Sequence, residues 1–94
     1  MLEKQMLEKQ IEEKSCRWAV NQGWLQYKFT SPSRRSVPDR MFIRNGRVVF
    51  IEFKTEKGRL TSGQEREIER LKNADCEVHV CRSLDEVKGV LGGA

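Results

Sequence analysis

Residues 39–54, with the sequence DRMFIRNGRVVFIEFK, decide the fold. Asn45-Gly46 stands between two apolar runs, and both residues tolerate the positive φ that a two-residue hairpin turn requires. The stretch therefore predicts two antiparallel strands, residues 39–44 and 47–54, joined by this turn.

The turn also fixes which residues of the hairpin face each other. If Arg44 pairs with Arg47, counting back places Asp39 opposite Glu52. Side chains alternate between the two faces of a strand, so Glu52 and Lys54 share a face and Asp39 joins them. Two carboxylates with Cβ atoms about 5 Å apart and an ammonium group one step away should therefore meet at the end of the hairpin.

This trio suits metal-dependent phosphate chemistry. Two adjacent carboxylates repel each other unless a cation lies between them, and hard oxygen ligands suit Mg²⁺ or Mn²⁺. Such a metal polarises a phosphodiester and lowers the pKa of a bound water, and a lysine beside it can orient the water or stabilise charge. The competing interpretation is an exposed sheet face with a surface salt bridge, which contributes little to stability.

The flanking sequence predicts an α-β-β-β-α-β-α order, which makes the class α/β with a central mixed sheet. Helices are expected at 2–22, 62–74 and 83–91, and the remaining strands at 24–29 and 77–82. A capping box of Ser83 and Glu86 is expected to open the last helix. On the first helix, Glu12 shares a stripe with the small residues Cys16 and Ala19, whereas Glu13 lies on a different stripe.

Bulk properties limit the class of protein. A length of 94 residues indicates one domain, residues 1–94, with a core that a partner subunit would help to stabilise. A net charge of +4 is compatible with nucleic acid. No apolar run is long enough to span a membrane, and the charged N-terminus is unlike a signal peptide. Three cysteines without CxxC spacing favour reduced thiols in the cytoplasm over a disulfide scaffold or a zinc site.

Several motifs resemble a known nuclease family. Val37-Pro38-Asp39, followed by Glu52-Phe53-Lys54, resembles the PD-(D/E)XK motif. Together with the run at 28–32 (KFTSP), the hairpin and Gln64, the pattern over residues 8–91 is similar to the VRR-NUC branch, the virus-type replication-repair nucleases. Ser36 departs from the family, which usually has glycine there.

The resemblance implies a restriction-endonuclease-like core that hydrolyses DNA phosphodiesters, with Mg²⁺ or Mn²⁺ as the cofactor. Asp39, Glu52 and the Phe53 carbonyl would hold the metal, and Lys54 would position the water or stabilise charge. The family also uses a glutamate on the first helix, which we assign to Glu12 rather than Glu13.

Other residues have two open interpretations. Gln64 either serves the site or forms a capping box with Thr61, and both roles are compatible. Four basic residues are expected to contact DNA, with simple solubility as the alternative for the two loop arginines. These four are Lys28, Arg34, Arg35 and Arg40.

The leading hypothesis is a structure-selective DNA endonuclease that resolves four-way (Holliday) junctions as a homodimer, in the cytoplasm of a host cell if a phage encodes it. The apolar residues Met6, Leu7, Trp18 and Trp24 are expected to exceed the needs of one core and to leave a patch for the partner. The alternatives are a non-catalytic DNA-binding module, a nuclease subunit that prefers flaps or duplex, and a protein-interacting subunit of a replication complex.

Overall fold

The computed structural model describes residues 2–92, and the side chains of residues 7–92. The order of elements matches the α-β-β-β-α-β-α prediction, with shifts of at most one residue at the ends. The elements are α1 (Leu2–Asn21), β1 (Leu25–Lys28), β2 (Arg40–Arg44), β3 (Arg47–Phe53), α2 (Ser62–Asn73), β4 (Glu77–Cys81) and α3 (Leu84–Leu91). None of the helices in this described part is long and apolar enough to cross a membrane.

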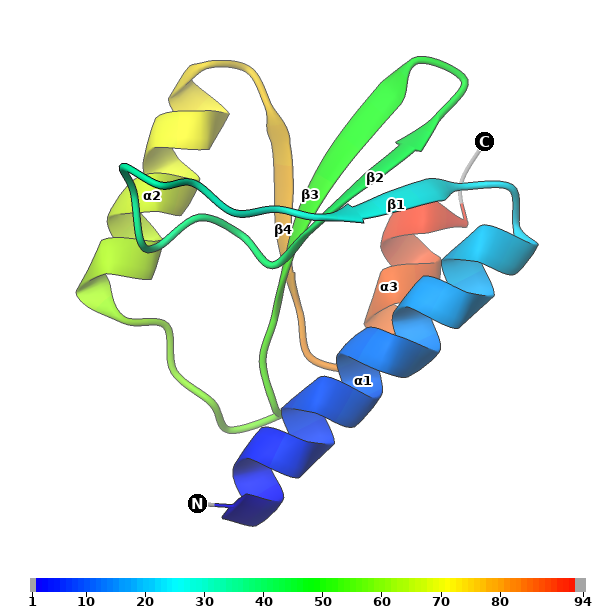
Figure 1. Cartoon of the computed structure of the whole chain (residues 1–94), viewed down its shortest axis with the longest axis horizontal. Helices are drawn as coiled ribbons and strands as arrows, with labels where there is room; N and C mark the ends of the chain where they lie inside the picture. Colours follow the sequence, from blue (N-terminus) through cyan, green and yellow to red (C-terminus); the bar gives the residue numbers. More distant parts are fainter. Residues whose placement is uncertain (1, 93–94) are drawn as a thin grey trace.

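The four strands form one mixed sheet in the order β1-β2-β3-β4 (Figure 1). The first three strands are antiparallel neighbours, and β4 pairs with β3 in parallel. A parallel neighbour requires a crossover connection, and α2 provides it. The predicted mixed sheet is therefore confirmed.

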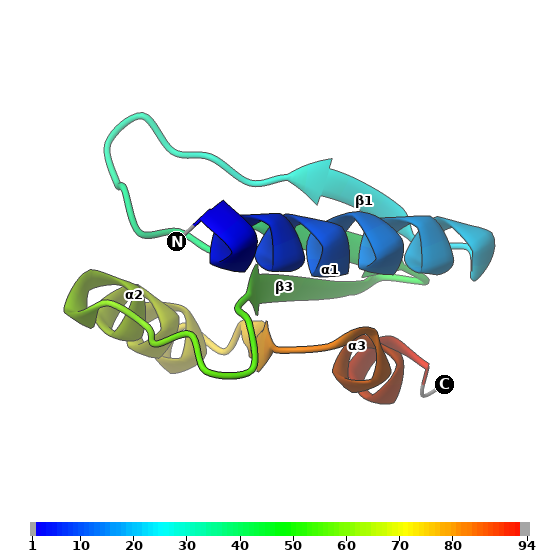
Figure 2. The same cartoon turned by 90° about the horizontal axis from the view of Figure 1, so that it is seen from below.

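Helices cover both faces of this sheet. Figures 1 and 2 show α1 and α3 on one face and α2 on the other. The face under α1 and α3 carries the main core, because Phe42, Val49, Ile51 and Phe53 all have 0% exposure. The opposite face carries Glu52 and Lys54, which alternate with these core residues along β3.

The rotation of α1 agrees with the small-residue stripe. Cys16 and Ala19 are buried against the sheet, whereas Glu13 and Arg17 are exposed. Short side chains allow the helix backbone to approach the sheet closely, and this brings Glu12 over the end of β2.

The apolar surplus proposed for a partner lies elsewhere than expected. Trp24 is only 2% exposed, and Trp18 packs against the same core cluster, so these two residues serve the core of their own chain. Trp24 is also stacked on Arg44 and Arg47, with guanidinium carbons 4.6 and 5.7 Å from its ring centroid. Leu7 is exposed, and the Met6 side chain lies outside the described residues.

The large apolar side chains that are exposed instead gather mainly on the sheet. Leu25, Tyr27 and Val48 are 57%, 50% and 40% exposed. The register Leu25↔Ile43↔Val48 places them on one face, the same face as Glu52. The sheet therefore leaves an apolar strip, Leu25, Tyr27 and Val48, beyond the part that α2 covers.

At the start of α3, one of the two hydrogen bonds of the predicted Ser83/Glu86 capping box is present and the other is not. The Ser83 hydroxyl accepts a hydrogen bond from the Glu86 amide at 3.1 Å. The Glu86 carboxylate, however, accepts from the amide of Arg82 at 2.7 Å rather than from Ser83. The capping box is thus half formed, because the carboxylate reaches one residue further back.

Candidate active site

The hairpin brings two acids together at its open end. Arg44 pairs with Arg47 and Arg40 with Ile51, so the next position outward places Asp39 opposite Glu52. Asp39 Oδ2 accepts a 2.8 Å hydrogen bond from the Phe53 amide, which fixes its carboxylate against the end of β3. The register and this hydrogen bond therefore agree with the predicted opposition of the two carboxylates.

Glu52 is the buried centre of the cluster. Its exposure is 3%, and two polar groups reach its carboxylate. Lys54 Nζ lies 3.9 Å from Oε2, and Gln64 Nε2 donates a 3.0 Å hydrogen bond to the same oxygen. Lys54, which directly follows β3, and Gln64 on α2 thus converge on one carboxylate.

The electrostatics of the cluster favour a cation. Burial, followed by the neighbouring Asp39 carboxylate, raises the pKa of Glu52 to about 8. Burial also raises the pKa of Asp39, although the Phe53 amide acts in the opposite direction. A buried acid pair that resists ionisation gains stability when a cation is bound between the carboxylates.

Gln64 fills both roles left open by its sequence context. Its side-chain oxygen accepts from the Thr61 amide at 2.9 Å, and the Thr61 hydroxyl accepts from the Gln64 amide at 3.0 Å. This capping box leaves the side-chain nitrogen free to point at Glu52. The start of α2 therefore holds a donor rigidly beside the acids.

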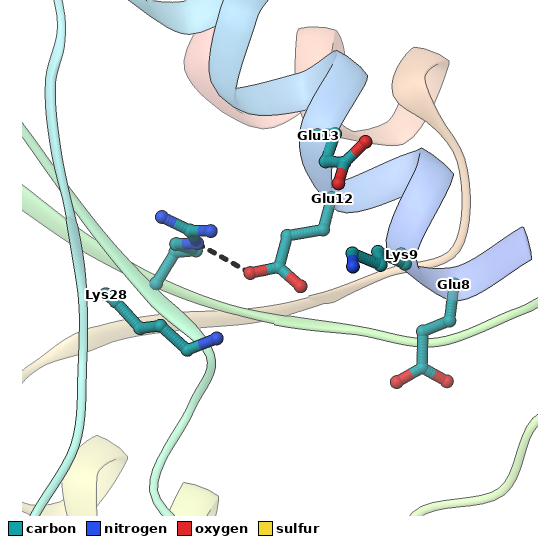
Figure 3. A pocket seen from close by; sticks show the side chains of 6 residues that line it. Glu8, Lys9, Glu12, Glu13 and Lys28 are labelled. Carbon is teal, nitrogen blue, oxygen red and sulfur yellow. Dashed lines mark hydrogen bonds and ion pairs between the residues drawn. The ribbon is translucent and has the colours of Figure 1, made fainter. Parts of the chain in front are cut away.

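Two glutamates of α1 approach the site from the other side of the sheet. Glu12 forms a 2.6 Å ion pair with Arg40, and its charge contributes to the raised pKa of Asp39. Glu8, one turn earlier, contributes to the raised pKa of Glu52. Figure 3 shows both lining a pocket of about 280 Å³ with Lys28.

Glu8 lines this pocket, but the sequence did not predict it as a candidate site residue. It lies four residues before Glu12, so the two share a face of the helix. This i, i+4 spacing is the signal in the sequence that could have found it.

The donors present fit a hard divalent cation. Backbone N–H and C=O groups of one residue in a strand point to the same side, so the Phe53 carbonyl is directed toward Asp39 along with its amide. Among the described residues, no three His, Cys, Asp or Glu side chains gather as a metal-binding group. Mg²⁺ is commonly held by one or two carboxylates with water completing its shell, which Asp39 and Glu52 can supply.

The predicted DNA contacts fall into two places. Lys28 lies on the rim of the pocket beside Glu12. The guanidinium of Arg40 is held by Glu12 and by Gln26 at 2.9 Å, so it is engaged within the chain. Arg34 and Arg35 lie further away, where the loop 30–36 approaches α2.

The departure at Ser36 causes no backbone strain. Among the described residues, positive φ occurs outside glycine only at Asn45 and Asp75, so the Ser36 backbone is ordinary. Room for its side chain comes from α2, because a Cβ on Gly63 would lie 2.6 Å from Ser36 Oγ. A glycine on the helix thus accommodates the serine on the loop.

Comparison with known proteins agrees with this geometry. The VRR-NUC domain model matches residues 4–85. A protein of Acyrthosiphon pisum secondary endosymbiont phage 1, named "Putative nuclease p44", is 42% identical over 64 residues, which cover 67% of this chain and 69% of the phage protein. A solved structure described as a VRR_NUC domain superposes with a TM-score of 0.83 at 24% identity, covering 92% of this chain and 95% of its own.

Proposed function

Because the chain belongs to the VRR-NUC domain family, we propose that it is a DNA endonuclease that uses Mg²⁺ or Mn²⁺ to hydrolyse phosphodiester bonds, and that it acts on four-way junctions as a homodimer. The observation that carries the proposal is the convergence of Lys54 and Gln64 on a buried carboxylate, Glu52, that lies opposite Asp39. If Glu52 belonged only to a surface salt bridge, its carboxylate would be exposed to water.

In this proposal, Asp39 and Glu52 hold the metal, with the Phe53 carbonyl as a further oxygen ligand. The metal, when bound, supplies positive charge to the scissile phosphate and acidifies a bound water. Glu8 and Glu12 lie close enough to affect the acids electrostatically, which is consistent with contact through water.

Lys54 acts on the reacting atoms from beside Glu52. Its ammonium orients the attacking water and stabilises the charge that develops on the phosphate oxygens. The water oxygen forms the new bond to phosphorus and gives up a proton to the surrounding water, the ester P–O bond breaks, and the departing oxygen takes up a proton from the surrounding water. Gln64 keeps the Glu52 carboxylate in one orientation through this step.

The homodimer proposal now rests on the apolar strip rather than on the tryptophans. Leu25, Tyr27 and Val48 lie on the face that carries Glu52. Along β3, Val48 is about 13 Å from that acid, and the position in register with Tyr27 is about 7 Å from it. A two-fold contact through this strip would place two identical sites near one surface. A four-way junction is itself close to two-fold symmetric, so two such sites suit opposing strands.

The test is cleavage of labelled four-way junctions, flaps and matched linear duplexes with Mn²⁺ or Mg²⁺, beside an EDTA control. Paired, metal-dependent cuts in the junction are expected. A protein that binds these DNAs without cutting any of them would instead be the non-catalytic module. If a monomer cuts flaps or linear duplex in preference to junctions, the protein is still a nuclease but the proposal that it resolves four-way junctions is wrong.

Light scattering tests the dimer independently. Leu25→Glu with Val48→Glu should yield a monomer, because charges replace the apolar strip.

We also propose a cytoplasmic location, which is supported by three cysteines that are all free.

A further inference from the structure

A cluster of basic residues lies where the loop before β2 approaches α2. The loop residues 33–36 and the helix residues Gly63, Arg66, Glu67 and Arg70 enclose a groove of about 450 Å³. We call this the arginine groove. It contains four guanidinium groups and one carboxylate, a formal excess of three positive charges.

The helix side of the groove is one continuous stripe. Gly63, Arg66, Glu67 and Arg70 are spaced three or four residues apart, which places them on one face of a helix. The stripe from Gly63 to Arg70 is about 10 Å long at 1.5 Å per residue. The two arginines of the stripe, Arg66 and Arg70, are about 6 Å apart along the helix axis, which allows them to contact neighbouring phosphates of one strand.

A buried carboxylate organises the arginines. Glu67 is 8% exposed, and its Oε1 lies 3.6 Å from Arg34 Nη1 and 3.5 Å from Arg70 Nε. Both arginine side chains remain about half exposed, at 49% and 58%. Glu67 therefore ties the loop to the helix and leaves the two guanidiniums accessible to a ligand.

We infer that the arginine groove binds internucleotide phosphates of the DNA strand that enters the acid cluster, with Arg66 and Arg70 as contacts and Glu67 as a positioning residue. The inference rests on the proposed function. Gly63 in the groove directly precedes Gln64, which contacts Glu52, so the groove begins one residue from the acid cluster and a strand bound at the acids is within its reach. Guanidinium forks match phosphate oxygens in geometry and charge.

The first test measures duplex binding by fluorescence anisotropy in EDTA at several salt concentrations. Arg66→Gln with Arg70→Gln should weaken binding and reduce the slope of log K against log salt by about 0.9 for each phosphate that the variant no longer neutralises. The matching lysine variants should restore most of the slope. Arg17→Gln, an exposed change on α1, is the control and should leave the slope unchanged.

The second test separates positioning from simple charge. Glu67→Gln and Glu69→Gln each make the protein more positive by one charge, but only Glu67 lies in the groove. We expect weaker binding from Glu67→Gln and undiminished binding from Glu69→Gln. Stronger binding by the Glu67 variant would contradict the positioning role.

The outcomes distinguish this inference from the proposed nuclease. If the double glutamine variant binds with the wild-type slope while the wild type still cuts DNA, the groove inference is wrong and the nuclease stands. If the wild type neither binds nor cuts DNA, the proposed function itself fails. The same titration is repeated with duplexes that carry or lack 5′-phosphates. If the double variant weakens binding only to duplexes with 5′-phosphates, the groove binds terminal phosphates and the inference is wrong.

Discussion

Gln64 Nε2 donates a 3.0 Å hydrogen bond to Oε2 of Glu52 while its side-chain oxygen caps α2. The Gln64 side chain thus both stabilises α2 and orients the carboxylate of Glu52. Thr61 shares the cap and does not reach the acid, and this difference allows the two roles to be separated.

Gln64→Ala should lower both stability and cleavage, whereas Thr61→Ala should lower stability alone. Loss of a cap costs about 1 kcal/mol, equivalent to a Tm decrease of about 4 to 8 °C in a domain this small. Thermal unfolding and junction cleavage measured on both variants test this. Equal cleavage by the two would mean that Gln64 serves only the helix.

Lys54→Ala should reduce cleavage by about 10² to 10⁴ and leave DNA binding intact, because a water that is not oriented attacks slowly. Lys57→Ala, an exposed lysine in the same connection, is the matched control. The measurements are single-turnover cleavage and anisotropy binding. Near-normal cleavage without Lys54 would remove it from the proposed site.

Asp39→Asn should weaken Mn²⁺ binding by about tenfold or more, which corresponds to about 1.4 kcal/mol. The asparagine oxygen can still accept from the Phe53 amide, so the fold should persist. Asp75→Asn is a suitable control, because its positive φ of 63° is also tolerated by asparagine. Calorimetric titration with Mn²⁺ measures the affinity. An unchanged Mn²⁺ affinity in Asp39→Asn would show that Asp39 is not a metal ligand.

Glu8→Gln and Glu12→Gln should each reduce cleavage more than Glu13→Gln, since only the first two affect the acids electrostatically. Glu12→Gln should also lower the Tm, because it weakens the ion pair with Arg40. Cleavage rates and melting curves for the three variants form the test. A dominant effect at Glu13 would contradict the observed rotation of α1.

Without metal, the free energy of unfolding should fall as pH rises from 4.5 to about 8, the ordinary and folded pKa values of Glu52. In this window the folded protein keeps a proton that the unfolded chain has released, so rising pH favours unfolding. Glu77, whose pKa is lowered to about 2 mainly by its hydrogen bond with Arg47, has the opposite sign but acts below this window.

Melting curves across this range, with and without Mn²⁺, measure the effect. Glu52→Gln should abolish most of the pH dependence and melt higher than the parent near pH 8. A parent protein whose Tm is constant across the window would show that Glu52 ionises normally.

The sequence predicts the acid pair well because the signal is local. Asn45-Gly46 sets the turn, and the register of a short hairpin then follows by counting to Asp39 and Glu52. The capping role of Gln64 is local in the same way, since Thr61 lies three residues before it.

Contacts between distant segments were harder to predict. Trp24 stacks on arginines about twenty residues away, so its place in the core depends on how the chain folds back. The arginine groove requires the loop at Arg34 to meet α2 at Glu67, and no local pattern encodes that meeting. Glu8 required the rotation of α1 to be known over more than two turns.

The acids and the loop arginines lie in separate parts of the chain, and this separation has an evolutionary consequence. Glu52 lies on β3 and Asp39 directly precedes β2, whereas Arg34 and Arg35 lie in the middle of the connection between β1 and β2. Loops tolerate substitution and insertion far better than the elements they connect. The proposed function therefore predicts that relatives differ in the DNA they recognise through changes in the loop 30–36, while the acids of the hairpin stay the same.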